Sequence, residues 1–429
     1  MMSFDFDNAL TGLKNGRNFS LVTFDNLTAL LKKIKEGSGE FIFARIFEDL
    51  CVIKEIKQIS REIRGKFDSL IVAGIGGSSL GARCLYDNFL NKKERRGLKV
   101  FFMENIDSQS IASILDLVNP AKTAVNFISR SGTTLETVTH FFILREIFRK
   151  RLGSDYGSHF YVTTANMSSP LGRAAASEGY RLITLPPELS GRYSVLSPVG
   201  LLPASCAGID IDEIIAGARA GKGASLKKHI YSNPALMGAA VNYFHYKKGK
   251  KIAAIMPYRD SLFSFGEWFA QIWAESLGKK SWNGIANGQT PIRGIGVQDQ
   301  HSLMQLYLDG PDDKIVIFLT AGAEYDFKIK NSGENFKYLE GKTVNDVLFA
   351  EQKATEIVLG SRERPSWSVH MDAVSPYNMG ALFFIFETMT VFAANLFKVN
   401  PFDQPAVEEI KGWAKKILAS GSNRAKKEN

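Results

Sequence analysis

Short apolar runs alternate with longer segments of helical pattern along most of the 429-residue chain, and this alternation constrains the fold more than any other feature. The runs are rich in β-branched and aromatic residues and stand at 70–73, 100–103, 125–128, 160–163 and 182–185, then at 252–256, 315–319, 356–359 and 367–370. Strands separated by segments long enough for a helix are typical of parallel sheets with both faces covered. We therefore expect an α/β protein with two parallel sheets, each flanked by helices.

The two series of runs predict two domains, and a chain of this length with 45% hydrophobic residues has enough apolar surface for both cores. We expect a helical N-terminal segment over 1–50, a first α/β domain over 51–205, a second over 206–400, and a C-terminal helix with a basic tail over 401–429. The apolar stretch Gly380 to Phe397 carries Glu387 and Thr388 at its centre, which favours a buried core helix over a membrane span.

Composition indicates a cytoplasmic protein with small-molecule rather than macromolecular partners. The three cysteines, Cys51, Cys84 and Cys206, form no CxxC pair, and the first residues carry acids where an export signal carries basic and apolar residues. The net charge of +9 is modest and concentrated in local runs such as 92–96, 247–251 and 424–427. Because aromatic and basic residues do not interleave, nucleic acid is a weak alternative, and we expect neither a nucleic acid nor a membrane as partner.

A glycine-rich segment over 72–81 follows a predicted strand and precedes a helical pattern. Glycines permit a tight turn with close approach of the backbone, and the free amides of a helix start favour an anion such as phosphate. The segment has no Gly-Lys-Ser/Thr, and Ser79 occupies the third glycine position of a dinucleotide fingerprint, so neither nucleotide motif is present. The alternative is a strand-to-helix turn that binds nothing.

A second loop of this kind, over 127–137, has the sequence Phe-Ile-Ser-Arg-Ser-Gly-Thr-Thr-Leu-Glu-Thr. Its hydroxyl groups, its arginine and its backbone amides are suited to wrapping a dianion. A capping box between Thr133 and Glu136 would account for two of these residues without any ligand. It would leave Ser129, Arg130 and Ser131 unexplained, which favours a phosphate loop.

Two further segments supply an arginine and a carboxylate. Arg192 lies between Gly191 and Tyr193, where a fixed cation could stabilise an oxyanion, although a surface arginine is the simpler interpretation. Gln271 and Glu275 are four residues apart in a helical pattern over 265–279 and therefore share one face. A carboxylate there could act as a general base, and the alternative is a solvent-facing glutamate on an amphipathic helix.

The remaining candidates are ambiguous by themselves. His301 is one of six histidines, and their spacing matches no metal-binding motif, so no metal site is predicted. In 400–411, Asp403 and Pro405 suit a helix start, and Glu408 with Lys411 could be a routine exposed pair.

Taken together and in this order, the segments resemble the glucose-6-phosphate isomerase (phosphoglucose isomerase) family, in its compact bacterial-type branch, over residues 70–415. The resemblance is carried by Gly-Ile-Gly-Gly-Ser-Ser-Leu-Gly at 74–81, Gly-Arg-Tyr-Ser at 191–194 and Phe-Asp-Gln-Pro-Ala-Val-Glu-Glu-Ile-Lys at 402–411. It implies two sugar-isomerase (SIS) domains with the site between them, a C-terminal helix that closes the site, a homodimer, and no metal or organic cofactor.

The resemblance also implies a role for each candidate residue in the interconversion of glucose 6-phosphate and fructose 6-phosphate. Glu275 corresponds to the base, Arg192 to the cation that stabilises the enediolate, and His301 and Lys411 to the ring-opening pair, with His301 reaching the neighbouring subunit's site. The substrate contacts would be Ser78, Ser129, Arg130, Ser131, Thr134, Gly191, Gln271 and Gln404. The alternatives are a non-catalytic SIS sugar-phosphate sensor, which has no need of Glu275, His301 and Lys411 together, and a dual glucose/mannose phosphate isomerase.

Overall fold

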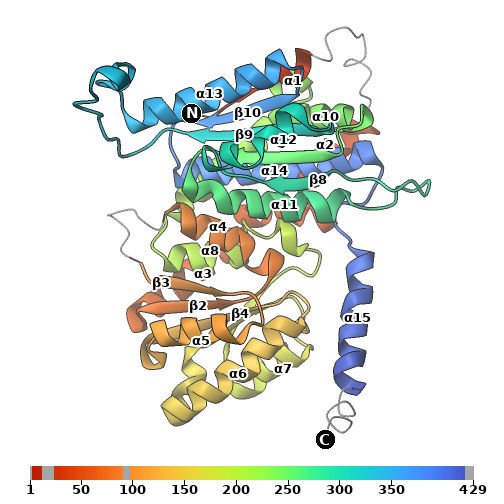
Figure 1. Ribbon diagram of the computed structural model, residues 1–429. Helices are drawn as coiled ribbons and strands as arrows, with labels where there is room; N and C mark the ends of the chain where they lie inside the picture. The colour runs from red at the N-terminus through yellow and green to blue at the C-terminus, as the bar shows by residue number, and fades with distance from the viewer. Residues whose placement is uncertain (1, 12–23, 90–96, 421–429) are drawn as a thin grey trace, which may run out of the picture.

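Two five-stranded sheets form the frame of the computed structural model, which describes residues 2–11, 24–89 and 97–420 (Figure 1). The first sheet has the order β3-β2-β4-β5-β6, and all of its neighbouring strands are parallel, as predicted. Its strands are β2 (Ser69–Ala73), β3 (Lys99–Met103), β4 (Thr123–Ile128), β5 (Phe160–Thr164) and β6 (Arg181–Thr184).

Helices cover both faces of the first sheet because its central strands are apolar on both sides. Leu70 and Val72 point to one face and Ile71 and Ala73 to the other, and each pair joins a different hydrophobic cluster. The face towards the second sheet packs on α3 (Leu50–Lys66), α4 (Leu80–Asn88) and α8 (Pro198–Cys206). The outer face packs on α5 (Ser108–Leu117), α6 (Leu135–Leu152) and α7 (Pro170–Glu178).

The second sheet has the order β1-β10-β9-β7-β8 and is parallel except for β1 (Met2–Asp5), which pairs antiparallel with β10. Its other strands are β7 (Ile252–Pro257), β8 (Thr290–Arg293), β9 (Lys314–Ala321) and β10 (Ser366–Met371). The inner face packs on α9 (Ile211–Ser225), α10 (Pro234–Lys247), α11 (Phe263–Leu277) and α14 (Pro376–Phe397). The outer face packs on α12 (Met304–Asp309) and α13 (Val344–Ser361).

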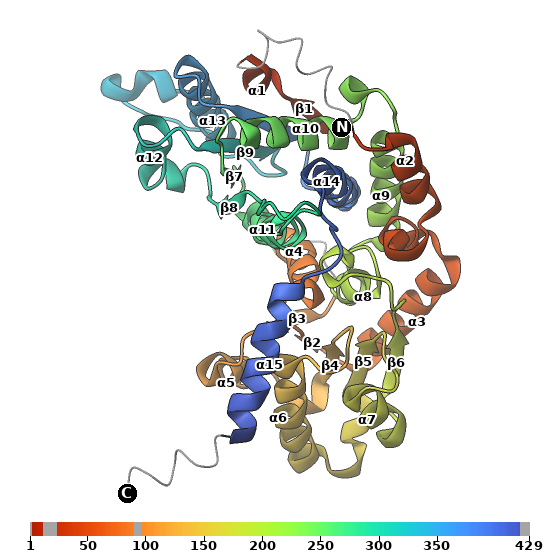
Figure 2. The same cartoon turned by 90° about the vertical axis from the view of Figure 1, so that its right-hand side faces the viewer.

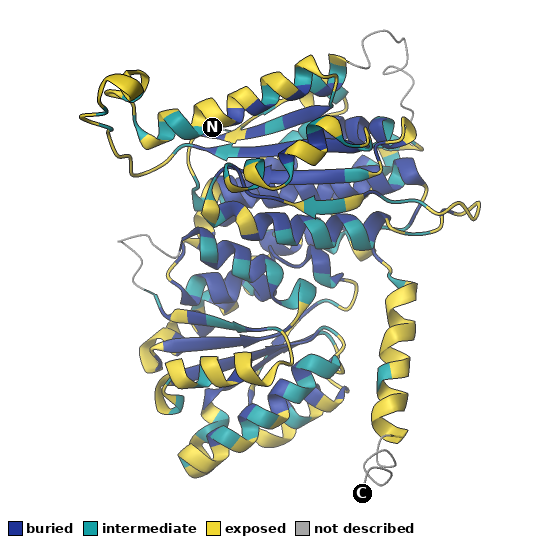
Figure 3. Cartoon of the chain, viewed as in Figure 1, coloured by how far each residue is buried: buried dark blue, intermediate teal, exposed yellow. Residues whose placement is uncertain are grey.

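One continuous hydrophobic core fills the space between the two sheets. It joins Leu70 and Val72 of the first sheet to Ile315 and Val369 of the second through the inner helices. Its central helix, α14, is the one helix of the described chain long and apolar enough to cross a membrane by composition, but 94% of that window is buried in the protein (Figure 3). The prediction of a buried core helix is therefore confirmed.

The second sheet differs from the prediction in one expected strand and in one strand that was not expected. Residues 356–359, predicted as a strand, belong to α13, whose buried residues Gln352, Thr355 and Leu359 recur at helical spacing and whose start is fixed by a capping box from Thr343. The unexpected strand is β8, a four-residue edge strand that pairs in parallel with β7. Pro291 is tolerated there because an edge strand leaves some of its backbone donors unpaired.

The N-terminal segment is helical as expected at α1 (Asp7–Thr11) and α2 (Leu27–Glu36), but it begins with β1, which the sequence did not predict. At the other end, α15 (Pro405–Ser420) runs beside the first domain without a buried residue (Figures 1 and 2). The basic run at 92–96 and most of the basic tail lie outside the described residues. The domain boundaries at 50, 205 and 400 stay predictions.

Candidate active site

The first sheet places two of the predicted loops side by side. Its strand order reverses between β2 and β4, which are neighbours, and ligands of open α/β sheets bind at such a reversal, outside the carboxyl ends of the strands. The glycine turn at 74–78 follows β2, and the loop at 129–134 follows β4. A Cβ added at Gly74 would lie 3.1 Å from the carbonyl oxygen of Ile128, the last residue of β4, so the glycine turn contacts the point from which the second loop starts.

The 129–134 loop is closed by its own hydroxyl groups. Ser129 Oγ lies 2.8 Å from Thr134 Oγ1 and accepts the Gly132 amide at 3.0 Å, while Ser131 Oγ accepts the Thr133 amide at 3.2 Å. Gly132 has φ +65° and lies against Ser169, so both its backbone conformation and its surroundings require glycine.

The capping-box alternative for this loop is wrong. Helix α6 begins at Leu135 with Thr134 as its N-cap, and the Thr134 side chain makes no capping hydrogen bond. Thr133 therefore lies outside the helix, and the first amides of α6 have no side-chain cap. Uncapped amides at a helix N-terminus, next to the four hydroxyl groups of the loop and Arg130, form a site suited to an anion.

The glycine turn also contacts the segment that carries Arg192. A Cβ added at Gly77 would lie 2.2 Å from the Gly191 carbonyl carbon and 2.6 Å from the Arg192 amide nitrogen, so the two backbones touch. The loop after β4 joins the same place, since Arg130 donates to the Leu189 carbonyl at 3.4 Å. Two loops of the first sheet and the 3₁₀ turn Gly191–Tyr193 thus meet at one point.

Arg192 is buried, and all three nitrogens of its guanidinium have partners. Nε donates to Ser276 Oγ at 2.9 Å, and Nη1 donates to Gln404 Oε1 at 2.7 Å and to Glu275 Oε2 at 3.2 Å. Nη2 donates to the carbonyls of Pro401 and Asp403. A buried arginine held in this way is an immobile positive charge, which rules out the surface-arginine interpretation.

Glu275 lies in the last turn of α11 with both carboxylate oxygens accepting hydrogen bonds. Oε1 accepts from Gln271 Nε2 at 3.1 Å, and Oε2 accepts from Arg192. Its side chain is 34% exposed, whereas that of Arg192 is 1% exposed, so the carboxylate is reachable from solvent and its counter-charge is not. Gln271 Oε1 has no hydrogen-bond partner among the described residues, which leaves an acceptor for a ligand hydroxyl beside the carboxylate.

The segment 401–404 docks onto this cluster, but the helix after it does not. Gln404 contacts Arg192 as described above, and Lys279 Nζ pairs with Asp403 Oδ1 at 2.6 Å. Burial lowers the pKa of Lys279. Lys411 lies on the exposed α15 and donates to Glu408 Oε1 at 2.7 Å, so within this chain the exposed-pair interpretation holds and α15 closes no site.

His301 is likewise separate from Glu275 within the chain. It ends the 3₁₀ helix Gln298–His301, is exposed, and makes no side-chain hydrogen bond to the described part of the protein. Its neighbours are nevertheless firmly held: Gln300 Nε2 donates to Tyr258 Oη and Thr355 Oγ1, each at 2.7 Å, and Asp299 Oδ2 accepts the Ile295 amide at 2.7 Å. The histidine is thus presented outward from a rigid turn.

Several contacts of the cluster were not anticipated. Ser276, which follows Glu275, bridges Arg192 Nε and the hydroxyl of the buried Tyr193, whose oxygen lies 3.1 Å away. Burial raises the pKa of Tyr193. In the sequence, the role of Ser276 was indicated only by its position next to the candidate base. Among the residues that the structure describes, no group of three or more histidines, cysteines and acids is placed to hold a metal ion.

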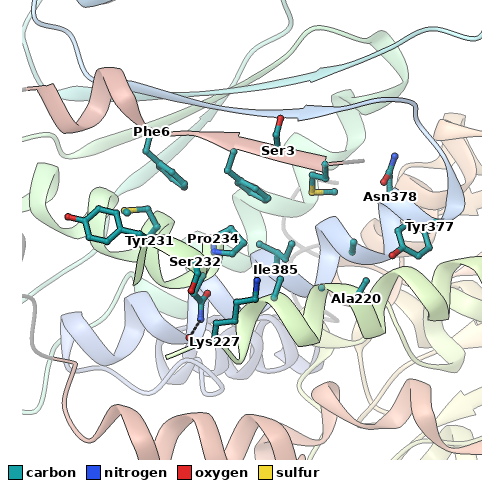
Figure 4. Close-up of a pocket in the computed structure, with 17 residues that line it drawn as sticks. Ser3, Phe6, Ala220, Lys227, Tyr231, Ser232, Pro234, Tyr377, Asn378 and Ile385 are labelled. Carbon is teal, nitrogen blue, oxygen red and sulfur yellow. Dashed lines mark hydrogen bonds between the residues drawn. The ribbon is translucent and has the colours of Figure 1, made fainter. Parts of the chain in front are cut away.

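A cavity of about 400 Å³ lies elsewhere, between β1, α9, α10 and α14 (Figure 4). Its lining is largely apolar, with Lys227, Ser232 and Asn378 among the polar residues. It includes none of the predicted site residues, so the candidate site is assigned from the contacts of Arg192 and Glu275.

A loop suited to an anion, at the switch point of a parallel sheet and next to a carboxylate and a fixed guanidinium, is the arrangement expected of an α/β enzyme that isomerises sugar phosphates. Comparison with known proteins makes this specific, because the model of the phosphoglucose isomerase family matches residues 54–429. The chain belongs to the phosphoglucose isomerase family.

Similar proteins cover nearly the whole chain. The glucose-6-phosphate isomerase of Carboxydothermus hydrogenoformans is 38% identical over 401 residues, which are 90% of this chain and 86% of that protein. A probable glucose-6-phosphate isomerase of Methanococcus maripaludis is 35% identical over 97% of this chain and 94% of its own. The crystal structure of a hypothetical protein from Thermus thermophilus superposes with a TM-score of 0.88 at 31% identity, covering 98% of this chain and 100% of that one.

Proposed function

We propose that this chain catalyses the reversible isomerisation of glucose 6-phosphate to fructose 6-phosphate, a step of glycolysis and gluconeogenesis. The observation that carries the proposal is the Glu275 carboxylate, held between Gln271 and the buried Arg192 beside an anion loop. Membership of the phosphoglucose isomerase family and relatives named glucose-6-phosphate isomerase support it.

The phosphate is bound by the two loops at the switch point of the first sheet. Uncapped amides at the start of α6 and the hydroxyl groups of the loop supply donors, and Arg130 supplies positive charge. The substrate contacts on this side of the site are Ser78, Ser129, Arg130, Ser131, Thr134 and the backbone at Gly191. The sugar hydroxyls face Gln271 and Gln404.

Glu275 moves one proton between adjacent carbons of the open-chain sugar. In the forward direction its carboxylate takes the proton from C2 of the aldose, and the C–H electron pair forms the enediolate double bond while the C1 carbonyl becomes the oxyanion. Arg192 stabilises that negative charge without having to reorient, because the surrounding acceptors fix its guanidinium. Return of the proton to C1, with transfer of the hydroxyl proton from O2 to O1, completes the ketose.

Ring opening needs an acid and a base, and in the described part of the chain neither His301 nor Lys411 makes a hydrogen bond to Glu275. We assign these roles to His301 and Lys411 and propose that a homodimer supplies His301 from the neighbouring subunit. The exposed position of His301 on a rigid turn supports this arrangement, since a group that completes another subunit's site must be both accessible and fixed. Docking of a second subunit beside the unpartnered α15 would also bring Lys411 into a defined position.

The first experiment is turnover of fructose 6-phosphate, coupled to glucose-6-phosphate oxidation, with and without excess chelator. Wild-type protein should turn over in both, and Glu275→Gln should lose at least ~10²-fold in kcat while retaining affinity for a phosphorylated sugar acid. Glu55→Gln, an exposed position on α3, is the control and should match wild type. A folded wild-type protein without turnover would instead favour the sugar-phosphate sensor, and loss of activity with chelator would contradict metal-free chemistry.

The second experiment tests the shared site. Glu275→Gln and His301→Ala should each be inactive, and co-refolding them should restore about a quarter of wild-type activity, because about half of a random mixture is heterodimer with one intact site in two. Verified mixed dimers with no more activity than the separate variants would place His301 outside the neighbour's site.

We also propose that the protein works in the cytosol. All three cysteines are unpaired, and Cys84 and Cys206 are buried, where burial raises the thiol pKa and keeps the thiols unreactive. Fractionation of the source cells with an antibody against this chain would test the assignment.

A further inference from the structure

A network of four charged side chains and one serine lies behind the candidate site, between the first domain and α11. Arg83 of α4 pairs through Nη2 with Glu267 Oε2 at 2.8 Å and through Nε with Glu104 Oε2 at 3.2 Å. Glu104 Oε1 accepts the hydroxyl of Ser79 at 2.6 Å, and Glu267 Oε1 accepts from Arg293 Nη1 at 3.0 Å.

We propose that Arg83 and Glu267 are positioning residues, which hold the glycine turn of the first domain in a fixed position relative to the catalytic helix α11. This inference rests on the isomerase function proposed above. Neither residue is among the proposed substrate contacts. They act through the turn that carries Ser78 and through the helix that carries Gln271 and Glu275.

The helix side of the network follows from its spacing. Glu267, Gln271 and Glu275 are spaced four residues apart on α11 and therefore lie along one face of the helix. The carboxylate that binds Arg83 is thus on the same stripe as the candidate base, and a rotation or shift of α11 that moved Glu275 would also break the Arg83 pair.

The turn side of the network is as direct. Ser79 is fully buried, and its hydroxyl lies between Glu104 Oε1 and the Gly76 carbonyl, the latter at 3.3 Å. Gly76 in turn lies against Gln271, since an added Cβ would be 2.8 Å from Gln271 Nε2. The turn therefore meets α11 at two levels, by direct contact at Gln271 and through Arg83 one turn earlier on the helix.

The side chains of Arg83, Glu104 and Glu267 are 26%, 25% and 16% exposed, so water screens them only in part. A guanidinium is suited to this position because its planar fork reaches two carboxylates at once, whereas a lysine ammonium is a single point charge on a flexible stem. Arg83→Lys therefore keeps the charge and removes the fixed geometry.

The test compares Arg83→Lys with Arg145→Lys. Arg145 pairs with Glu178 at 3.0 Å on the outer side of the first sheet, with side-chain exposures of 34% and 28%, and links nothing to α11. We measure kcat and KM for fructose 6-phosphate and the thermal midpoint of each variant. Arg83→Lys should lose about tenfold or more in kcat/KM, with kcat lowered and KM raised, because the glycine turn and Glu275 are no longer held in a fixed relative position. Arg145→Lys should stay within about twofold of wild type.

Glu267→Gln provides the second measurement. If the two residues act through one contact, the double variant Arg83→Lys with Glu267→Gln should be little worse in kcat/KM than either single variant. The inference is overturned if Arg83→Lys matches Arg145→Lys in activity, or if the two single losses multiply in the double variant. Inactive wild-type protein would instead refute the isomerase function on which the inference rests.

Discussion

The contact between Gly77 and Gly191 makes a quantitative prediction. Alanine at position 77 would place a Cβ 2.2 Å from the carbonyl carbon of Gly191, 2.4 Å from its oxygen and 2.6 Å from the Arg192 amide nitrogen. All three neighbours are backbone atoms, so no side-chain rotation relieves the clash. Carbon atoms in ordinary contact are about 3.5 Å apart, and the two segments must therefore separate by roughly 1 Å.

That separation moves the residue beside it. Arg192 is also held by Glu275 on α11 and by Gln404, neither of which lies on its own segment, so a displaced backbone at 191–192 shifts the guanidinium against these acceptors. A misplacement of about 1 Å in a catalytic arrangement costs about 10²-fold in rate. We therefore expect Gly77→Ala to lower kcat/KM for fructose 6-phosphate by about 10²-fold.

The matched control is Gly223→Ala on α9, where an added Cβ meets nothing within 4 Å. It should retain full activity and gain slightly in thermal midpoint, because alanine is a better helix former than glycine. The coupled isomerase assay is run at a temperature where both variants are shown to be folded by circular dichroism. Gly77→Ala with a kcat/KM within about threefold of the control would refute the argument that the two backbones must touch.

Two further predictions concern binding and stability. Changing Ser129 and Thr134 together to alanine should raise KM and weaken inhibition by a phosphorylated sugar acid more than it lowers kcat. The reason is that the loop binds the phosphate, which lies away from the reacting carbons. Unchanged inhibitor affinity would show that the loop does not bind phosphate. Burial raises the pKa of Glu387 well above its ordinary value of 4.5. The folded protein therefore keeps its full stability below pH 4.5, where this carboxyl is protonated in both states, and loses stability as the pH rises and the unfolded chain releases the proton. The thermal midpoint of Glu387→Gln should therefore exceed that of wild type, by a difference that grows between about pH 5 and pH 8. A difference that stays constant or shrinks over this range would show that Glu387 is not buried in its uncharged form.

Much of the fold was predictable because buried parallel strands are apolar along their whole length. The five predicted strands of the first sheet all overlap the observed strands, and both faces of β2 are buried. The failure at 356–359 arose because Ile357, Val358 and Leu359 resemble a short strand. Only the longer helical spacing and the capping box at Thr343 identify α13.

For the candidate site, the local sequence indicated candidate residues more readily than it indicated which of them lie in contact. Glu275 and Gln271 share a face by spacing alone, but their contact with Arg192 depends on packing between two domains. Ser79, Glu104 and Arg83 were missed because their partners are far apart in sequence. His301 and Lys411 are exposed and make no hydrogen bond to Glu275 in the described chain, so their predicted roles stay predictions.

The pairing of β1 with β10 has a consequence for the order in which the chain folds. Residues 2–5 are made long before their partner strand at 366–371, because the two segments lie far apart in the sequence. Bringing together segments so far apart costs loop-closure entropy and slows folding. Until β10 has been made, β1 has no partner strand in its sheet, and an unpaired strand edge readily pairs with another chain. The nascent chain is therefore most exposed to misassembly just before its second sheet is completed.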